Sequence, residues 1–172
     1  MGQCQALFQK KTQDYGTAWR ILRPSSLTDQ LYIKAKRIRS IEEKGTQKVA
    51  DRVEDDYLGL INYSVMALIQ LDLPADAPLD LPVEEVVALY QRKAQHARRL
   101  LEAKNHDYGE AWRDMRMASI TDMILQKLLR VRQIEDNAGQ TLVSEGLEAN
   151  YLDIINYAIF ALIKLNEQNA AS

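Results

Sequence analysis

The strongest constraint on this 172-residue chain is that it contains the same segment twice. Residues 11–52 match residues 104–145 at 17 positions and residues 54–71 match residues 148–165 at 10, so 27 of 60 paired positions are identical. Agreement of this extent indicates a tandem duplication. The positions that both copies keep show which residues the repeat requires, and many of them are polar.

The composition is that of a globular protein, with 47% hydrophobic residues and a net charge of −2. An acidic balance argues against nucleic acid as the partner. The single cysteine, Cys4, has no partner for a disulfide and no zinc-binding spacing. No apolar run approaches the roughly 20 residues of a membrane span, and the N-terminus lacks a secretion signal. We therefore expect a cytoplasmic protein without a membrane segment.

Prolines and hydrophobic periodicity divide the chain. Three of the four prolines, Pro74, Pro78 and Pro82, fall in residues 73–82 and predict a linker between repeat 1 (residues 1–72) and repeat 2 (residues 83–172). No alternating strand pattern occurs. Each repeat predicts about three helices, with the first helix of repeat 1 about ten residues shorter than its copy. The prediction is an all-α, tandem-duplicated helical bundle packed about a pseudo-twofold axis, as a monomeric pseudo-dimer or a homo-oligomer.

The second and third helices of each repeat carry apolar stripes at helical spacing. In repeat 1 the stripe of the second helix is Leu27, Leu31, Ala35, Ile38 and Ile41. A serine with an acid three residues later, Ser26 with Asp29 and Ser119 with Asp122, resembles a capping box and predicts the start of this helix.

Charged residues fall on these same stripes in both copies. On the second helix, Lys34 and Glu42 lie inside the stripe and Arg37 lies at its edge, as do Lys127, Glu135 and Arg130. On the third helix, Glu54 and Glu148 face the apolar side, with Asn62 and Asn156 flanking it. Core-facing charges are costly unless they are paired or bind a ligand. Two interpretations remain: a polar pocket with acids for a metal and bases for phosphates, or internal ion pairs and side chains that extend into water.

A second shared motif lies where the first helix of each repeat ends. Gly16 and Gly109 are expected to end these helices with a positive φ. The preceding Asp14-Tyr15 and Asp107-Tyr108 are candidate binding residues, because an acid at a helix C-terminus opposes the macrodipole. Trp19 and Trp112 either stack on a base or belong to the core, the commoner case. His96 and His106 receive no role.

These motifs resemble a bacterial and phage family called nucleotide-modification-associated domain 1. That family typically shows Lys-x-x-Asp-Tyr-Gly and an Asp-Leu-x-Asn-Tyr-Ala helix, and the resemblance covers each repeat. The segment from Asp153 to Ala158 keeps the second motif, whereas repeat 1 has Gly59 where the acid is expected. A more distant likeness is to the all-α nucleoside triphosphate pyrophosphohydrolases of the MazG and dimeric dUTPase type, although their Glu-x-x-Glu signature is absent.

The leading hypothesis is a nucleotide-handling protein of the magnesium-dependent pyrophosphohydrolase type. The predicted Mg²⁺ ligands are Glu42, Glu54, Glu135, Glu148 and Asp153. The predicted substrate-binding and phosphate-binding residues are Lys34, Arg37, Lys127, Arg130, Asp14, Tyr15, Asp107, Tyr108, Asn62 and Asn156. The alternatives are a non-catalytic nucleotide-binding or adaptor module and, against the acidic charge, a nucleic-acid-binding protein. The two departures in repeat 1, the short first helix and Gly59, predict that repeat 2 carries the better-equipped site.

Overall fold

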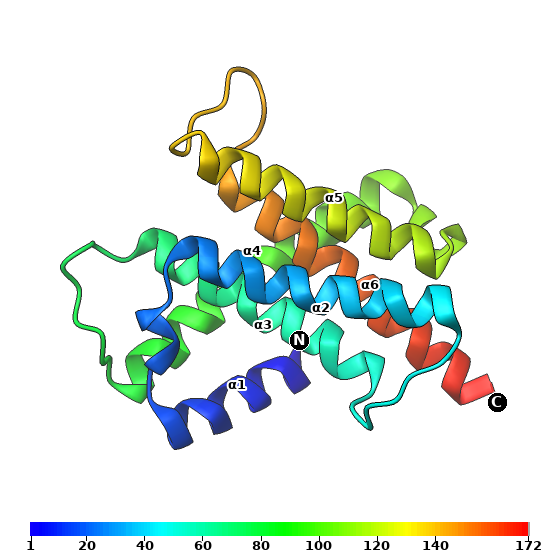
Figure 1. The fold of residues 1–172 in the computed structure, drawn as a ribbon, viewed down its shortest axis with the longest axis horizontal. Helices are drawn as coiled ribbons and strands as arrows, with labels where there is room; N and C mark the ends of the chain where they lie inside the picture. The colour runs from blue at the N-terminus through cyan, green and yellow to red at the C-terminus, as the bar shows by residue number, and fades with distance from the viewer. Residues whose placement is uncertain (172) are drawn as a thin grey trace.

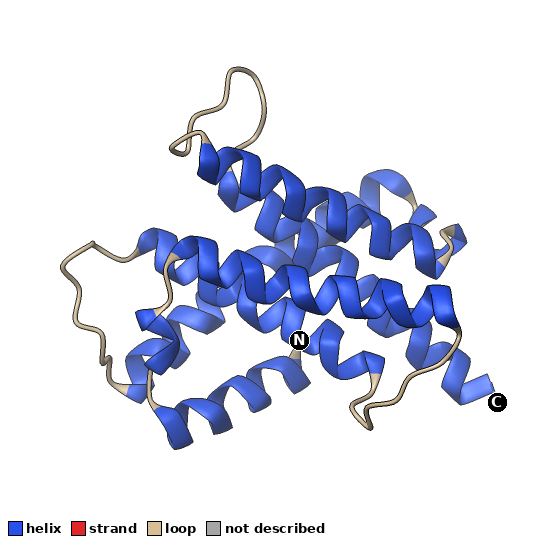
Figure 2. Ribbon diagram, viewed as in Figure 1, coloured by secondary structure: helices blue, strands red, loops and turns tan. Residues whose placement is uncertain are grey.

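The computed structural model describes residues 1–171, and these form six α-helices, two short 3-10 helices and no strand (Figures 1 and 2). Repeat 1 comprises α1 (Gly2–Tyr15), η1 (Ala18–Ile21), α2 (Pro24–Lys44) and α3 (Val53–Asp72). Repeat 2 comprises α4 (Val83–Tyr108), η2 (Ala111–Asp114), α5 (Met117–Asp136) and α6 (Leu147–Ala171). Ser172, which ends the predicted second repeat, lies outside the described residues. The prediction of an all-α fold with three helices in each repeat is confirmed.

The centre of the molecule is formed by the second and third helices of both repeats. Within each repeat, α2 packs on α3 and α5 packs on α6, while the α2–α5 and α3–α6 contacts join the repeats (Figure 1). None of the helices in residues 1–171 is long and apolar enough to cross a lipid bilayer. The two repeats share one core because the apolar stripe of each is covered by the other.

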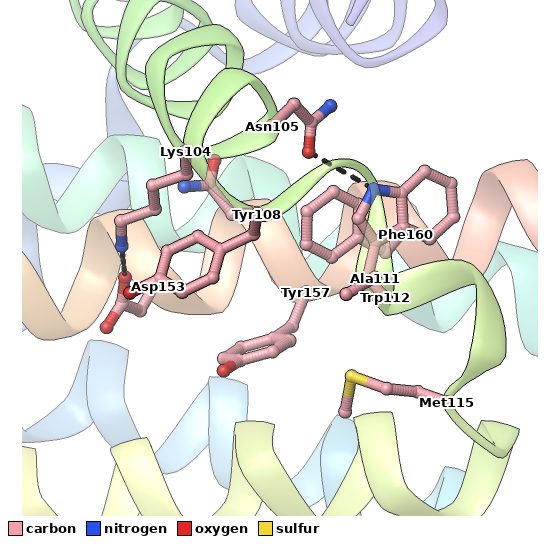
Figure 3. Close-up of a pocket in the computed structure, with 10 residues that line it drawn as sticks. Lys104, Asn105, Tyr108, Ala111, Trp112, Met115, Asp153, Tyr157 and Phe160 are labelled. Carbon is pink, nitrogen blue, oxygen red and sulfur yellow. Dashed lines mark hydrogen bonds and ion pairs between the residues drawn. The ribbon is translucent and has the colours of Figure 1, made fainter.

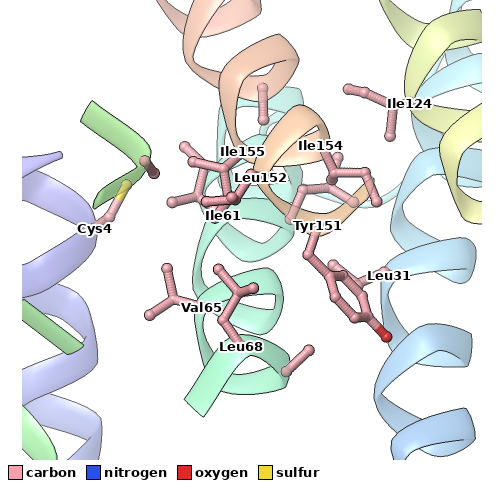
Figure 4. Close-up of a cluster of buried hydrophobic side chains, with 14 of the residues drawn as sticks. Cys4, Leu31, Ile61, Val65, Leu68, Ile124, Tyr151, Leu152, Ile154 and Ile155 are labelled. Carbon is pink, nitrogen blue, oxygen red and sulfur yellow. The ribbon is translucent and has the colours of Figure 1, made fainter. Parts of the chain in front are cut away.

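The core contains the stripes that the sequence predicts. Leu27, Leu31, Ala35 and Ile38 of α2 are fully buried, as are most of their counterparts on α5. In Figure 4, Ile61, Val65 and Leu68 of α3 lie in the same cluster as Tyr151, Leu152 and Ile155 of α6, with Leu31 of α2 and Ile124 of α5 on the right. Burial of these side chains at about 1.5–3 kcal/mol each is the main favourable contribution to folding.

The two first helices differ in length, as expected. α4 has 26 residues and α1 has 14. The additional N-terminal part of α4 packs on repeat 1, where the Tyr90 ring stacks on Phe8 at 4.4 Å. Both helices end at a glycine with positive φ, 59° at Gly16 and 58° at Gly109, so this part of the prediction is confirmed.

The predicted start of the second helix is wrong in both repeats. α2 begins at Pro24 and α5 at Met117, so Ser26 and Ser119 lie inside the first turn and cap nothing. The fixed φ of Pro24 suits the first helical position. Asp29 and Asp122 instead form ion pairs across the repeat interface. Arg132 Nη2 lies 2.6 Å from Asp29 Oδ1, and the equivalent Arg39 Nη1 lies 3.5 Å from Asp122 Oδ1.

Candidate functional site

Two of the predicted metal ligands, Glu42 and Glu135, belong to the interface between the repeats. Thr121 of α5 donates to Glu42 at 2.8 Å, and its hydroxyl lies 3.2 Å from Tyr57 Oη. The same arrangement joins Thr28 of α2 to Glu135 at 2.8 Å and to Tyr151 at 3.0 Å. Because a threonine hydroxyl has one proton and gives it to the carboxylate, each tyrosine donates to its threonine. Two equivalent tyrosine–threonine–glutamate networks therefore connect the repeats.

Burial alters the ionisation of both ends of each network. It raises the pKa of Glu42 above its ordinary value, against the hydrogen bond from Thr121, and the same causes act on Glu135. Burial likewise raises the pKa of Tyr57 and Tyr151 to about 12.

The five predicted metal ligands do not converge. Glu54 accepts a 3.4 Å hydrogen bond from Asn169, and Glu148 lies 3.6 Å from Lys93. The expectation that Glu148 faces the core is wrong: its side chain is exposed in the first turn of α6, where an acid favours the helix dipole. Within residues 1–171 no three His, Cys, Asp or Glu side chains are grouped as a metal site.

A cleft of repeat 2 with a volume of about 370 Å³ lies between the end of α4, η2 and the middle of α6. In Figure 3 the rings of Tyr108 and Tyr157 lie on the Asp153 side of the view, Trp112 and Phe160 lie on the other side, and Met115 lies below them. Trp112 stacks on Phe160 with ring centroids 4.4 Å apart, and its Nε1 donates to Asn105. This cleft is called the aromatic cleft below; its lining residues are Lys104, Asn105, Tyr108, Ala111, Trp112, Met115, Asp153, Asn156, Tyr157 and Phe160.

One carboxylate in the aromatic cleft is held between two lysines. Lys104 Nζ of α4 lies 2.5 Å from Asp153 Oδ1, and Lys127 Nζ of α5 lies 2.6 Å from Asp153 Oδ2. Burial by itself would raise the pKa of Asp153, but the two lysine hydrogen bonds and charges outweigh it and lower the pKa below the ordinary value. Asp153 is therefore ionised at neutral pH, and both of its oxygens are occupied by lysines.

Asn156, one turn further along α6, has a buried amide with no hydrogen-bond partner. The residue is 3% exposed and lines the aromatic cleft, and neither its nitrogen nor its oxygen is bonded within the described chain. Its counterpart Asn62 is fully used, since its nitrogen donates to the Cys4 carbonyl and its oxygen accepts from Tyr90 at 2.7 Å. An unpaired buried amide costs about 1–3 kcal/mol, so Asn156 is the clearest candidate for a ligand contact.

Repeat 1 has an equivalent cleft of about 370 Å³ with different chemistry. It keeps the counterparts of eight of the ten lining residues: Lys11, Thr12, Tyr15, Ala18, Trp19, Leu22, Tyr63 and Met66. Neither Gly59 nor Asn62, the counterparts of Asp153 and Asn156, lines it. Lys34 lies over Gly59 so closely that a Cβ on that glycine would be 2.6 Å from Lys34 Cε. Lys34 Nζ is 3.7 Å from Asp56, which lies one helical turn before Gly59. The acid that pairs with this lysine therefore lies one turn earlier on the third helix in repeat 1 than in repeat 2.

The predicted phosphate-binding and motif residues are distributed unevenly. Lys34 and Arg37 are both paired with Asp56, and Lys127 with Asp153, whereas Arg130 is exposed and forms no ion pair within residues 1–171. Tyr15 and Tyr108, 73% and 74% exposed, lie at the two equivalent clefts. Asp14 and Asp107 are exposed and line neither cleft.

Sequence reasoning missed most of the apolar lining of the aromatic cleft and the two threonines of the interface. The signal was present, since Lys104, Ala111, Trp112, Tyr157 and Thr121 are identical in the other copy. What the pattern did not reveal was which of these shared residues meet in space.

Comparison with known proteins gives one family. The profile described as nucleotide modification associated domain 1 matches residues 11–71 and 104–165, once in each repeat. No curated protein and no solved structure matches the chain, so the distant likeness to pyrophosphohydrolases gains no support. The two matched segments contain α2 and α5, nearly all of α3 and most of α6, together with most residues of both clefts. The chain therefore belongs to the nucleotide modification associated domain 1 family, as a tandem duplication of that domain.

Proposed function

We propose that this protein binds one nucleotide per chain, with the base in the aromatic cleft of repeat 2. The observation that carries the proposal is the unpartnered, buried Asn156 amide in a cleft lined by aromatic rings. A side-chain amide offers a donor and an acceptor side by side, which matches the edge of a nucleobase. The cleft volume of about 370 Å³ falls within the range of small-molecule sites.

The aromatic residues supply the second requirement. Trp112 is 7% exposed, stacks on Phe160 and has the Arg113 guanidinium 4.5 Å from its ring centroid. Tyr108 and Tyr157 also line the cleft and are less buried, so their rings are more available to a ligand. Stacking of a base on an aromatic ring contributes about 1–3 kcal/mol. Tyr108 and Tyr157 are the rings that we assign to this contact.

Magnesium-dependent hydrolysis is the catalytic form of the same proposal. Asp153 is the one predicted metal ligand that lines the cleft, and its oxygens are held by Lys104 and Lys127. Magnesium is often bound through one or two carboxylates together with substrate phosphates, so Mg²⁺ would enter with the nucleotide. Release of pyrophosphate in the presence of Mg²⁺, and its loss in Asp153→Asn, would support hydrolysis; binding without release would leave a binding module.

The test of binding is a thermal-shift and titration panel of the common ribonucleosides, deoxyribonucleosides and their 5′-phosphates. At least one of these compounds should stabilise the protein. Tyr108→Ala should lower the affinity for that compound by roughly fivefold or more, because the stacking contact is lost. The matched control is Tyr15→Ala in repeat 1, equally exposed, which should leave the affinity unchanged. Absence of binding across the panel, or equal loss in both variants, would contradict the proposal.

A further inference from the structure

A second, polar cleft is also lined by α6, nearer to the start of that helix than the aromatic cleft. It lies between the end of α5, the segment 137–146 and the start of α6, and has a volume of about 540 Å³. Arg130 and Asn150 both line it. Asn150 is 3% exposed; its nitrogen donates to the Gly146 carbonyl at 2.8 Å, and its oxygen has no partner within residues 1–171. The cleft thus contains a free cation and a buried, unused acceptor.

The equivalent place in repeat 1 is occupied by an acid. Arg37, the counterpart of Arg130, is paired through Nη1 with the Asp56 carboxylate and donates through Nη2 to the Asp51 carbonyl at 2.8 Å. Lys34 Nζ lies 3.7 Å from the same carboxylate. In repeat 2, Asn150 stands in place of Asp56, and Lys127, the counterpart of Lys34, has turned to Asp153. With this acid replaced by an amide, Arg130 forms no ion pair within residues 1–171, although Glu145 lines the same cleft.

We propose that Arg130 binds the phosphate of the ligand, in the position that the Asp56 carboxylate occupies in repeat 1. This inference rests on the proposed nucleotide binding and specifies a nucleoside phosphate rather than a nucleoside. A guanidinium fits phosphate as it fits carboxylate, through paired donors. The free oxygen of Asn150 accepts a hydrogen bond from a ligand hydroxyl, which a sugar phosphate supplies.

The two clefts are close enough for one nucleotide. Asn150 and Tyr157 lie two turns apart on α6, about 10 Å along its axis, with Asp153 between them. Arg130 is near enough to Tyr157 for its charge to favour ionisation of the tyrosine, although burial and the Asp153 charge together raise the Tyr157 pKa. Lys104, Lys127 and Arg130 place three cations against the two carboxylates of Asp153 and Glu145, so the path between the clefts keeps a net positive charge, which favours an anion.

The experiment compares the affinity of a nucleoside, its 5′-monophosphate and inorganic phosphate for the full chain. The monophosphate should bind roughly ten- to a hundredfold more tightly than the nucleoside, as expected for hydrogen bonds to a charged group. Arg130→Ala should abolish that difference and leave the nucleoside affinity unchanged. Asn150→Asp introduces the acid that Asp56 provides in repeat 1. It should also abolish the difference between monophosphate and nucleoside, because the new carboxylate pairs with Arg130. Arg37→Ala is the matched control in repeat 1 and should change neither affinity.

The outcomes separate the two proposals. Failure of every nucleoside and nucleotide to bind overturns nucleotide binding itself. Binding of nucleoside and monophosphate with equal affinity, or a difference that survives Arg130→Ala, overturns the role of Arg130 while nucleotide binding stands. Inorganic phosphate that binds as tightly as the monophosphate would make this an anion site independent of the base and would also overturn it. Arg130 is exposed, so its variant remains folded and decides the matter even if Asn150→Asp is unstable.

Discussion

At the scale of single residues, the threonines of the two cross-repeat networks are the most sensitive positions. Thr28 and Thr121 are fully buried, and each links a glutamate to a buried tyrosine of the other repeat. Thr121→Val keeps the shape but leaves the Tyr57 hydroxyl without its acceptor. We expect the free energy of unfolding to fall by about 1–3 kcal/mol. Urea denaturation measures this, and Thr28→Val should give a similar loss because its network is equivalent; a change within about 0.5 kcal/mol in both would refute the assignment.

The glutamates of these networks predict a dependence of stability on pH. Because the folded protein raises the pKa of Glu42 and Glu135, their stabilising contribution is fully present below the ordinary glutamate pKa of about 4.3 and is lost as the pH rises through the raised values. Glutamine accepts the same hydrogen bonds without titrating. The double variant Glu42→Gln, Glu135→Gln should therefore gain stability relative to the natural protein as the pH rises from 4 toward 7.

The pKa of Asp153 is lowered rather than raised, so its effect on stability falls at a lower pH than that of the two glutamates. Its lowered pKa means that its contribution is present above the ordinary aspartate pKa of about 3.9 and is lost only as the pH falls through the lower folded value. Unfolding measured by urea at several pH values between 4 and 7 thus reports on the two glutamates. A difference between the double variant and the natural protein that is constant across this range, or that reverses, would show that the carboxylates are not shifted as described.

At the scale of elements, the linker 73–82 is fixed to repeat 1 through η1. Arg20, 5% exposed, donates to the Pro78 carbonyl, and Thr17 both donates to the Leu79 carbonyl at 2.7 Å and accepts from Leu81 N at 3.0 Å. The counterpart Arg113 is exposed and pairs with Glu110 and Glu167. The same arginine of the repeat therefore has a structural role in one copy only.

This difference predicts unequal effects of one substitution. Arg20→Ala leaves linker carbonyls without a donor and should cost about 1–3 kcal/mol. Arg113→Ala removes exposed ion pairs and the contact of the guanidinium with the Trp112 ring, and should cost less stability than Arg20→Ala because exposed pairs contribute little. Thermal or urea unfolding of the two variants, side by side with the natural protein, compares them directly. Equal losses would show that the linker contact contributes nothing.

The same elements show what the sequence could and could not predict. Periodicity predicted the buried stripe of α2 because Leu27, Leu31, Ala35 and Ile38 repeat at the helical period. The sequence pattern misplaced the start of α2, because the helix begins at Pro24 and Ser26 already lies in its first turn. The role of Asp29 is an ion pair with Arg132 of the other repeat, which the local pattern of α2 cannot show. Angles on one helix also placed Glu42 near the core without revealing that its partner is Thr121 on another helix.

At the scale of the whole molecule, the duplication provides both the fold and the difference between the two halves. The pseudo-twofold core requires α2, α3, α5 and α6 to be nearly alike, whereas the periphery is free to diverge. Tyr90 of the longer α4 donates a hydrogen bond to Asn62, whereas within residues 1–171 the Asn156 amide has no hydrogen-bond partner. The prediction that repeat 2 is the better-equipped half came from Gly59 and the short first helix, but the occupation of Asn62 needed the three-dimensional contacts.

Although the two halves of the chain are similar, we expect only repeat 2 to bind a nucleotide. Calorimetric titration of the full chain with the tightest-binding nucleoside 5′-monophosphate of the panel measures the number of sites as well as the affinity. We expect one ligand per chain, with binding lost in Tyr108→Ala combined with Arg130→Ala and kept in Tyr15→Ala combined with Arg37→Ala. Two equivalent ligands per chain, or equal losses in both double variants, would show that the site is not confined to repeat 2.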